Sequence, residues 1–146
     1  MRGHGQLDDD LRRGGRYLEL SREYAAAALT LATAHERDNV GRAFFAIASH
    51  ALELSFKAFL RARGSSEDHM MMLNHNLERS LSSCLIQGMV PEDGELLALI
   101  DALGRHYAAQ SFRYPGWNVD LDRLPSPVHV ARILASHLKQ IEVTLA

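Results

Sequence analysis

Three polar side chains recur along one face of the most apolar stretch of the chain. His50, Glu53 and Lys57 are spaced i, i+3 and i+7, so on a helix they lie along one stripe. The spacing fits an exposed Glu53–Lys57 ion pair, worth about 0.3–0.5 kcal/mol, beside an ordinary surface histidine. It also fits a ligand site inside a helical bundle. Because unpaired buried charges are costly, the stripe must face either solvent or a polar pocket.

A second candidate is the segment Asn74-His75-Asn76-Leu77, which immediately precedes a predicted helix. An asparagine or a histidine at this place can cap the helix and close the preceding turn. Alternatively, the imidazole of His75 lies beside Asn76 at the mouth of the helix N-terminus, where backbone N–H groups favour anions. The sequence leaves both interpretations open.

A third candidate follows a predicted helix, where Arg113 and Tyr114 stand just before a Pro-Gly turn and Trp117. In such a loop the arginine can recognise phosphate, and the aromatic rings can stack on a base. The loop can also plug the end of a bundle, with its rings in the core and Arg113 paired with an acid such as Glu53. Nothing else in the sequence decides between these two interpretations.

Several familiar chemistries are absent from the sequence. It has no Gly-rich phosphate loop, no HExxH metal motif and no GxSxG motif. One cysteine, Cys84, excludes an intrachain disulfide and a cysteine-based zinc cluster, and the eight histidines lack zinc-ligand spacing. We therefore expect no metal and no cofactor. The net charge of −2 gives no global attraction to nucleic acid or to an anionic membrane.

The elements that must position these residues are helices, because apolar residues recur at helical intervals and no segment alternates in the manner of a strand. Pro91 suits the first turn of a helix, and Gly64 and Gly88 suit helix ends. The helices are predicted at Leu7–Ala34, Val40–Ala62, Leu77–Gln87, Pro91–Phe112 and Pro127–Leu145.

We predict one all-α domain over residues 1–146, an antiparallel bundle of about five helices. The helix over Val40–Ala62 is apolar nearly all round and should therefore be central and buried. Residues 1–10 are expected to fray, and Gly14 and Gly15 to split the first helix or delay its start. Residues 64–74 and 113–126 are expected to be irregular.

No targeting or spanning segment is expected. The charges near the N-terminus are not followed by an apolar stretch, so no signal peptide is predicted. The longest uninterrupted apolar run covers residues 43–48, far short of the roughly 20 residues that a membrane helix needs. We expect a soluble cytoplasmic protein without a membrane partner.

Three segments in this order resemble a branch of the HEPN superfamily of small prokaryotic helical proteins. They are ALELSFKAFL at residues 51–60, His75-Asn76-Leu77 with Leu81, and Arg113-Tyr114-Pro115. The resemblance covers about residues 17–140. It implies a bundle with two long antiparallel helices, commonly dimeric. It also implies work on RNA or nucleotides, as ribonuclease toxins, antiphage systems or partners of small nucleotidyltransferases.

The ribonuclease motif of that superfamily is an arginine, four to six residues and a histidine. It occurs here at Arg63…His69, Arg123…His129 and Arg132…His137, whereas about two matches are expected by chance. Only the copy at Arg132 and His137 lies in the last predicted helix. These two residues are five apart and point about 140° away from each other on an ideal helix.

Three hypotheses follow. The leading one is a non-catalytic, HEPN-like binding domain for a nucleotide, RNA or a protein partner such as a nucleotidyltransferase. Its site would combine Glu53, Lys57, His75, Asn76, Arg113 and Tyr114. The alternatives are a metal-independent ribonuclease using Arg132 and His137, and a structural module in which the polar cluster is a buried staple. A homodimer through a helix face is expected from the apolar helix, the small residues Ala25–Ala28 and the resemblance.

Overall fold

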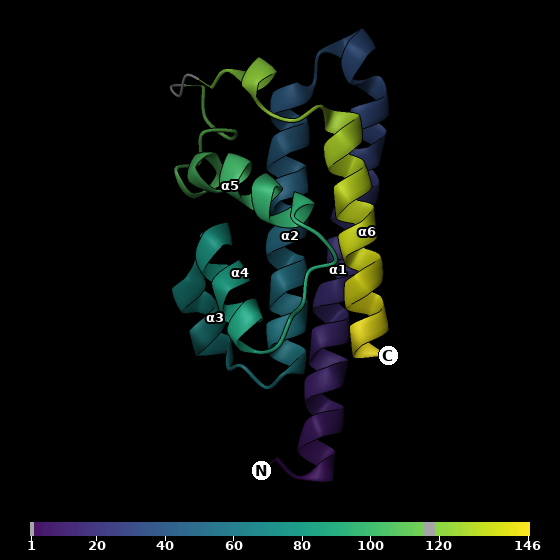
Figure 1. Cartoon of the computed structure of the whole chain (residues 1–146), viewed down its shortest axis with the longest axis vertical. Coiled ribbons are helices and arrows are strands. Elements are labelled where there is room, and N and C mark those ends of the chain that lie inside the picture. Colours follow the sequence, from purple (N-terminus) through teal and green to yellow (C-terminus); the bar gives the residue numbers. More distant parts are fainter. Residues whose placement is uncertain (1, 116–118) are drawn as a thin grey trace.

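The computed structural model describes residues 2–115 and 119–146. Over these residues the chain is all-α and contains no strand, which confirms the predicted fold class. Three long helices run side by side along the molecule, and three shorter ones cover one side of the central helix α2 (Figure 1). The elements are α1 (His4–Asp38), α2 (Gly41–Ala62), α3 (Glu67–Leu73), α4 (Leu77–Ile86), α5 (Glu95–Ala108), the 3₁₀ turn η1 (Leu121–Arg123) and α6 (Pro127–Leu145).

Helix α2 is the centre of the bundle, as its apolar sequence predicts, because it packs against all five other α-helices. Its large side chains are inaccessible to solvent, among them Phe45, Leu52, Phe56 and Phe59. By length and composition α2 is also the one described helix able to cross a membrane. However, 72% of its most apolar window is buried inside the fold, which is typical of a core helix.

Helix α1 is continuous from His4, so the predicted interruption at Gly14 and Gly15 is wrong. A Cβ atom at Gly14 would lie 2.7 Å from the carbonyl oxygen of Ala58 and 2.7 Å from Cβ of Ala62. The glycine therefore allows α1 and α2 to pack with their backbones in near contact. Asn39, with φ 53°, closes α1 in the left-handed conformation, and the chain turns back into α2.

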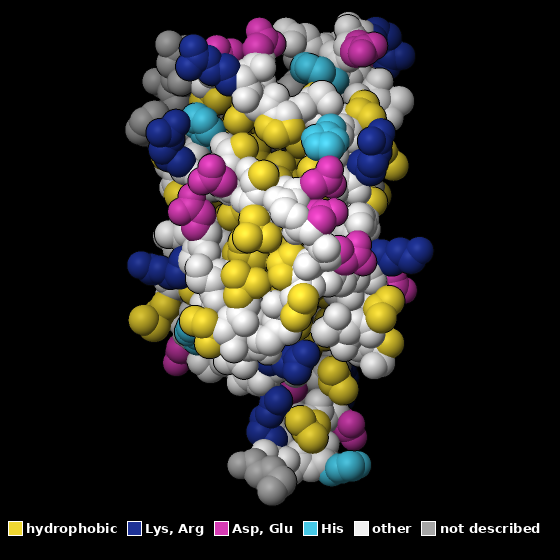
Figure 2. All heavy atoms as spheres, viewed as in Figure 1, with side chains coloured by type: hydrophobic (Ala, Val, Ile, Leu, Met, Phe, Trp, Pro, Cys, Tyr) yellow, Lys and Arg dark blue, Asp and Glu magenta, His cyan; other side chains and the backbone are white. Residues whose placement is uncertain are grey.

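The expectation that residues 1–10 fray is also wrong for residues 4–10, which are helical. The first turns of α1 project beyond the rest of the bundle (Figures 1 and 2). Asp10, fully buried, accepts hydrogen bonds from Arg61 (3.0 Å), Gln6 (3.0 Å) and Arg2 (2.5 Å). Burial would raise the pKa of Asp10, but these bonds outweigh burial and lower it. This network ties the start of α1 to the end of α2.

Two further boundaries differ from the sequence prediction. Residues 67–73, predicted as loop, form α3, because the Ser66 hydroxyl caps the helix and Met70 and Leu73 reach the core. The helix predicted from Pro91 begins at Glu95 and ends at Ala108, so Phe112 lies outside it. The Phe112 ring is nevertheless buried and stacks on Phe45.

Candidate functional site

The carboxylate of Glu53, in the middle of α2, is the centre of a polar cluster within the apolar bundle. His75 Nδ1 lies 2.7 Å from Glu53 Oε1, and His50 Nδ1 lies 3.0 Å from Oε2. The Tyr107 hydroxyl donates to Oε2 at 3.1 Å, and Lys57 Nζ forms an ion pair with Oε1 at 3.8 Å. We call these five residues the Glu53 cluster.

Three separate parts of the fold supply the cluster: α2, the link between α3 and α4, and α5, which carries Tyr107. Helix α2 presents His50 and Lys57 one turn on either side of Glu53, as the sequence spacing predicts. His75 lies in the short link between α3 and α4. The next residue, Asn76, is the N-cap of α4, and its side chain accepts a hydrogen bond from the Arg79 N–H at 2.9 Å. Asn76 thus has the capping role and fixes the backbone beside His75.

Electrostatics keep Glu53 ionised. Burial alone would raise its pKa, but the hydrogen bond from His50, the charge of Lys57 and the bond from His75 together lower it. A carboxylate only accepts hydrogen bonds, so both imidazoles donate through Nδ1–H. Burial and the nearby Glu53 charge raise the pKa of Tyr107, whose hydroxyl stays protonated and donates to the carboxylate.

The cluster is buried at its carboxylate and open at its histidines. Glu53 is 1% exposed, so the interpretation as an exposed ion pair is wrong. The side chains of His50, His75 and Lys57 are 31%, 36% and 18% exposed. Neither Nε2 atom makes a hydrogen bond within the described part of the chain. Each ring therefore presents Nε2 to solvent or to a ligand.

Aromatic rings hold the two imidazoles in place. The Tyr24 ring of α1 meets His50 edge to face, with 4.5 Å between ring centroids. Tyr107 of α5 meets His75 in the same manner at 5.7 Å. Packing and the shared carboxylate together fix the orientation of both rings.

The loop after α5 does not join the cluster directly. Arg113 donates to the Gln110 side chain at 3.1 Å, and among the described residues it makes no bond to Glu53. Its positive charge slightly opposes the rise in the pKa of the Tyr107 hydroxyl, so it lies near the cluster. Tyr114 is exposed, and its carbonyl oxygen accepts from Arg42 at 3.0 Å. Trp117 lies outside the described residues.

Arg132 and His137 do not meet, as their spacing on α6 indicates. His137 is 4% exposed and lies 2.8 Å, through Nε2, from the Ser55 hydroxyl of α2. Burial lowers the pKa of His137 to about 4. Arg132 is exposed on a groove between α1 and α6. The proposed ribonuclease pair is therefore not assembled within one chain.

Among the described residues, no group of three or more His, Cys, Asp or Glu is placed to hold a metal ion. Cys84, on the buried side of α4, is inaccessible, and burial raises the pKa of its thiol, so it is an inert core residue.

The candidate site set from the sequence lacks two members of the cluster. His50 belongs to the polar stripe of the sequence but was not placed in the ligand set. Tyr107 occupies an apolar position of its helix and gave no signal by spacing. Its hydroxyl was the available clue, because a buried tyrosine usually needs a hydrogen-bond partner.

Comparison of the chain with protein-family models, with curated proteins and with solved structures finds no match in any of the three.

Proposed function

We propose that this chain is a HEPN-like helical binding domain that takes the phosphate group of a nucleotide or of RNA at the Glu53 cluster. One observation carries the proposal: a single buried carboxylate orients two partly exposed imidazoles through their Nδ1 atoms. A purely structural ion pair has no need of two oriented histidines whose second nitrogens face outward.

The balance of charge favours an anionic ligand. The positive charge of Lys57 already balances the negative charge of Glu53. Any further positive charge, such as that of nearby Arg113, therefore makes the site net positive. An imidazole that donates Nδ1–H to a carboxylate can take up a proton at Nε2 and donate it to a phosphate oxygen. The charged hydrogen bonds that such a rim offers suit phosphate.

The proposal includes a homodimer through α1 and α6. Between these helices runs a groove with a mostly apolar lining, and large apolar side chains beside it are exposed, among them Leu29 and Val128. Arg22 of α1 and Glu142 of α6 pair across the groove at 2.8 Å. A second copy of the same face would cover the apolar side chains.

A second candidate function, metal-independent cleavage of RNA, is favoured by the content of the cluster. Two imidazoles and an ammonium group beside one carboxylate supply an acid, a base and a positive charge for phosphodiester chemistry. Because Arg132 and His137 are apart, this chemistry would use His50 and His75 instead. RNA cleavage that is lost in His75→Ala but retained in His137→Ala would support it over simple binding.

The binding proposal is tested with two fluorescent RNA oligonucleotides that differ only in a 5′-phosphate. We expect the phosphorylated RNA to bind more tightly, and Lys57→Met and His75→Ala each to remove about tenfold of its affinity, because each deletes a charged hydrogen-bond donor. Lys139→Met is the matched control, since Lys139 is the other lysine of the chain and is exposed on α6. Equal binding of both oligonucleotides, or equal losses in Lys57→Met and Lys139→Met, would refute the site.

A further inference from the structure

The loop that follows α5 carries an exposed cation and an exposed aromatic ring, Arg113 and Tyr114. Tyr114 is 54% exposed, which makes its ring the most exposed of the phenylalanines and tyrosines among the described residues. Arg113 donates to the neutral side chain of Gln110 and forms no ion pair within the described part of the chain. Its charge is therefore not cancelled.

This loop is attached to the helix that carries Glu53. Arg42, at the start of α2, donates to the backbone carbonyl oxygen of Tyr114 at 3.0 Å. Arg42 and Glu53 are 11 residues apart, so on α2 they lie within about 20° of each other and about 16 Å apart along the helix axis. The loop and the Glu53 cluster therefore lie over the same stripe of α2.

The stripe between the loop and the cluster is open to a phosphate chain. Ala46 lies on it between Arg42 and Glu53, and both Ala46 and His50 are partly exposed. Glu53 is the only acidic residue of α2, and Lys57 balances its charge. The uncancelled charge of Arg113 therefore makes this surface net positive.

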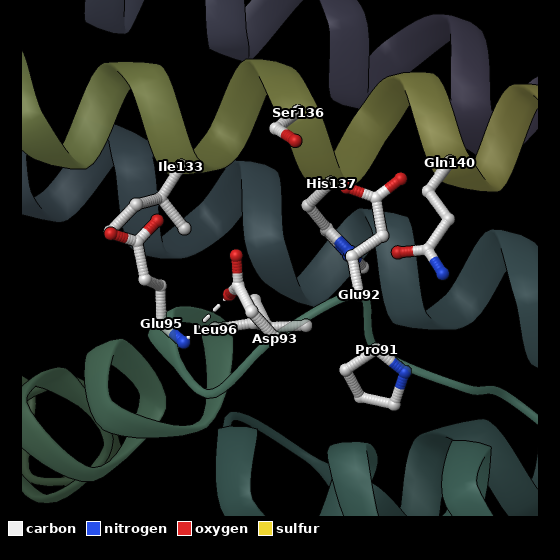
Figure 3. A pocket seen from close by; sticks show the side chains of 9 residues that line it. All are labelled: Pro91, Glu92, Asp93, Glu95, Leu96, Ile133, Ser136, His137 and Gln140. Carbon is white, nitrogen blue, oxygen red and sulfur yellow. Dashed lines mark hydrogen bonds between the residues drawn. The ribbon is translucent and has the colours of Figure 1, made fainter.

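The other side of α2 has the opposite charge. A small pocket lies there between the segment that leads into α5 and the middle of α6. Figure 3 shows Glu92, Asp93 and Glu95 extending their carboxylates from that segment toward α6. These carboxylates repel a chain of phosphates, whereas Arg113 attracts it.

A second group of cations, on α1, gives no comparable attraction. It consists of three exposed arginines, Arg12, Arg13 and Arg16. The same side of the helix carries three acidic residues, Asp9, Glu19 and Glu23. Asp9 forms ion pairs with two of the arginines. The net charge of this surface is therefore close to zero.

We propose that the ligand of the Glu53 cluster is a single RNA strand of several nucleotides, which runs along α2 to the loop after α5. There Arg113 contacts a phosphate and Tyr114 stacks on a base. This rests on the proposed binding of a phosphate group at the cluster, and it selects an RNA strand over a free nucleotide. Cationic side chains combined with aromatic rings hold single strands in this manner. A stacked strand advances about 3.4 Å per nucleotide, so about five nucleotides span the distance at most.

The first test varies the length of the strand. Calorimetric titration of the full chain uses 5′-phosphorylated oligoadenylates of one to seven nucleotides as probes. We expect the affinity to rise with length up to about five nucleotides and then to level off, because further nucleotides extend past the loop.

Substitutions in the loop separate the two contacts. Tyr114→Ala should weaken binding of the five-nucleotide strand about five- to a hundredfold, because one stacked base is lost, and Tyr114→Trp should preserve it. The single nucleotide, which ends before the loop, should be affected far less. Arg113→Gln should lower the slope of log affinity against log salt by about 0.7, the value for one phosphate contact of a single strand. Both side chains are exposed, and circular dichroism checks that the fold is preserved.

Arg16→Gln is the matched control, since it removes one exposed arginine from the other group of cations. An equal change of the salt slope in Arg16→Gln and Arg113→Gln would place the strand along α1 and overturn the proposal. The proposal also fails if affinity does not rise beyond one nucleotide while the 5′-phosphate is still required. The Glu53 cluster would then stand as a site for a nucleotide alone. If none of the phosphorylated probes binds, both the path of the strand and the phosphate site are refuted.

Discussion

Replacing Glu53 and Lys57 one at a time tests whether the Glu53 cluster is a ligand site or a structural staple, meaning an ion pair that only stabilises the fold. Glu53 is buried and accepts three hydrogen bonds, from His50, His75 and Tyr107. Lys57 is only an ion-pair partner, with its Nζ 3.8 Å from Oε1, and its side chain reaches solvent. The two partners therefore contribute unequally to the stability of the fold.

The magnitudes follow from the number of hydrogen bonds lost. Glu53→Gln leaves one carbonyl oxygen and turns an NH₂ group toward groups that are themselves donors. Each buried donor that loses its acceptor costs about 1–3 kcal/mol, so we expect a loss of about 2–4 kcal/mol in the free energy of unfolding. Lys57→Met leaves all three hydrogen bonds intact and removes one partly exposed ion pair, which costs less than about 1 kcal/mol.

The assay is urea unfolding of the wild type, Glu53→Gln, Lys57→Met and the control Lys139→Met, followed by circular dichroism at neutral pH. Equal m-values across the four proteins show that the comparison concerns stability alone. If Lys57→Met destabilises the protein as much as Glu53→Gln, then Lys57 is needed to hold the buried charge. The cluster would then be a staple, and the reasoning above would be refuted.

Three other predictions concern the rest of the fold. Because burial lowers the pKa of His137 to about 4 from 6.5, the unfolded chain binds more protons than the native chain between these pH values. Stability due to this group is therefore full above pH 6.5 and falls by about 3 kcal/mol as the pH drops to about 4. Urea unfolding across that range should show this loss, and His137→Phe should remove it. Gly14→Ala should cost about 1–3 kcal/mol in thermal unfolding, because its Cβ would meet the Ala58 carbonyl. Gly15→Ala, with open space around it, should instead stabilise the protein by up to about 1 kcal/mol, and equal effects of both would contradict this account of the helix contact. Light scattering should give twice the 16.3 kDa chain mass, and Leu29→Glu should return it to one chain, whereas a monomeric wild type would rule out the dimer.

The bundle was predictable where the sequence pattern is local. Helix α6 has the predicted bounds, and α2 and α4 differ from prediction by one residue at one end. The start of α1 was not predictable in this way. Buried Asp10 contributes to its stability, and one partner of Asp10, Arg61, is 51 residues distant in the sequence. Residues 4–10 have no apolar pattern of their own, and the Asp10 network that includes this long-range ion pair helps to fix them.

The candidate site was predictable to the same extent. Spacing on one helix places His50, Glu53 and Lys57 together, and the turn before α4 indicates His75. The spacing of residues within one helix does not show which other helix packs beside it. It therefore could not reveal that Tyr107 of α5 completes the cluster. For the same reason Arg113 could be assigned to the right region but not to its actual partner, Gln110.

The histidines on the two sides of α2 have opposite tautomers. In the Glu53 cluster, His50 and His75 donate through Nδ1 to a carboxylate, so Nε2 faces outward. At His137 the Nε2 hydrogen goes to the Ser55 hydroxyl, and burial, which lowers the pKa of His137 to about 4, keeps the ring neutral near pH 7. Glu53 and Ser55 select these tautomers, and being two residues apart they point about 200° around α2 from each other. One buried helix thus fixes different histidine tautomers on its two sides, a distinction that the number of histidines in the sequence does not contain.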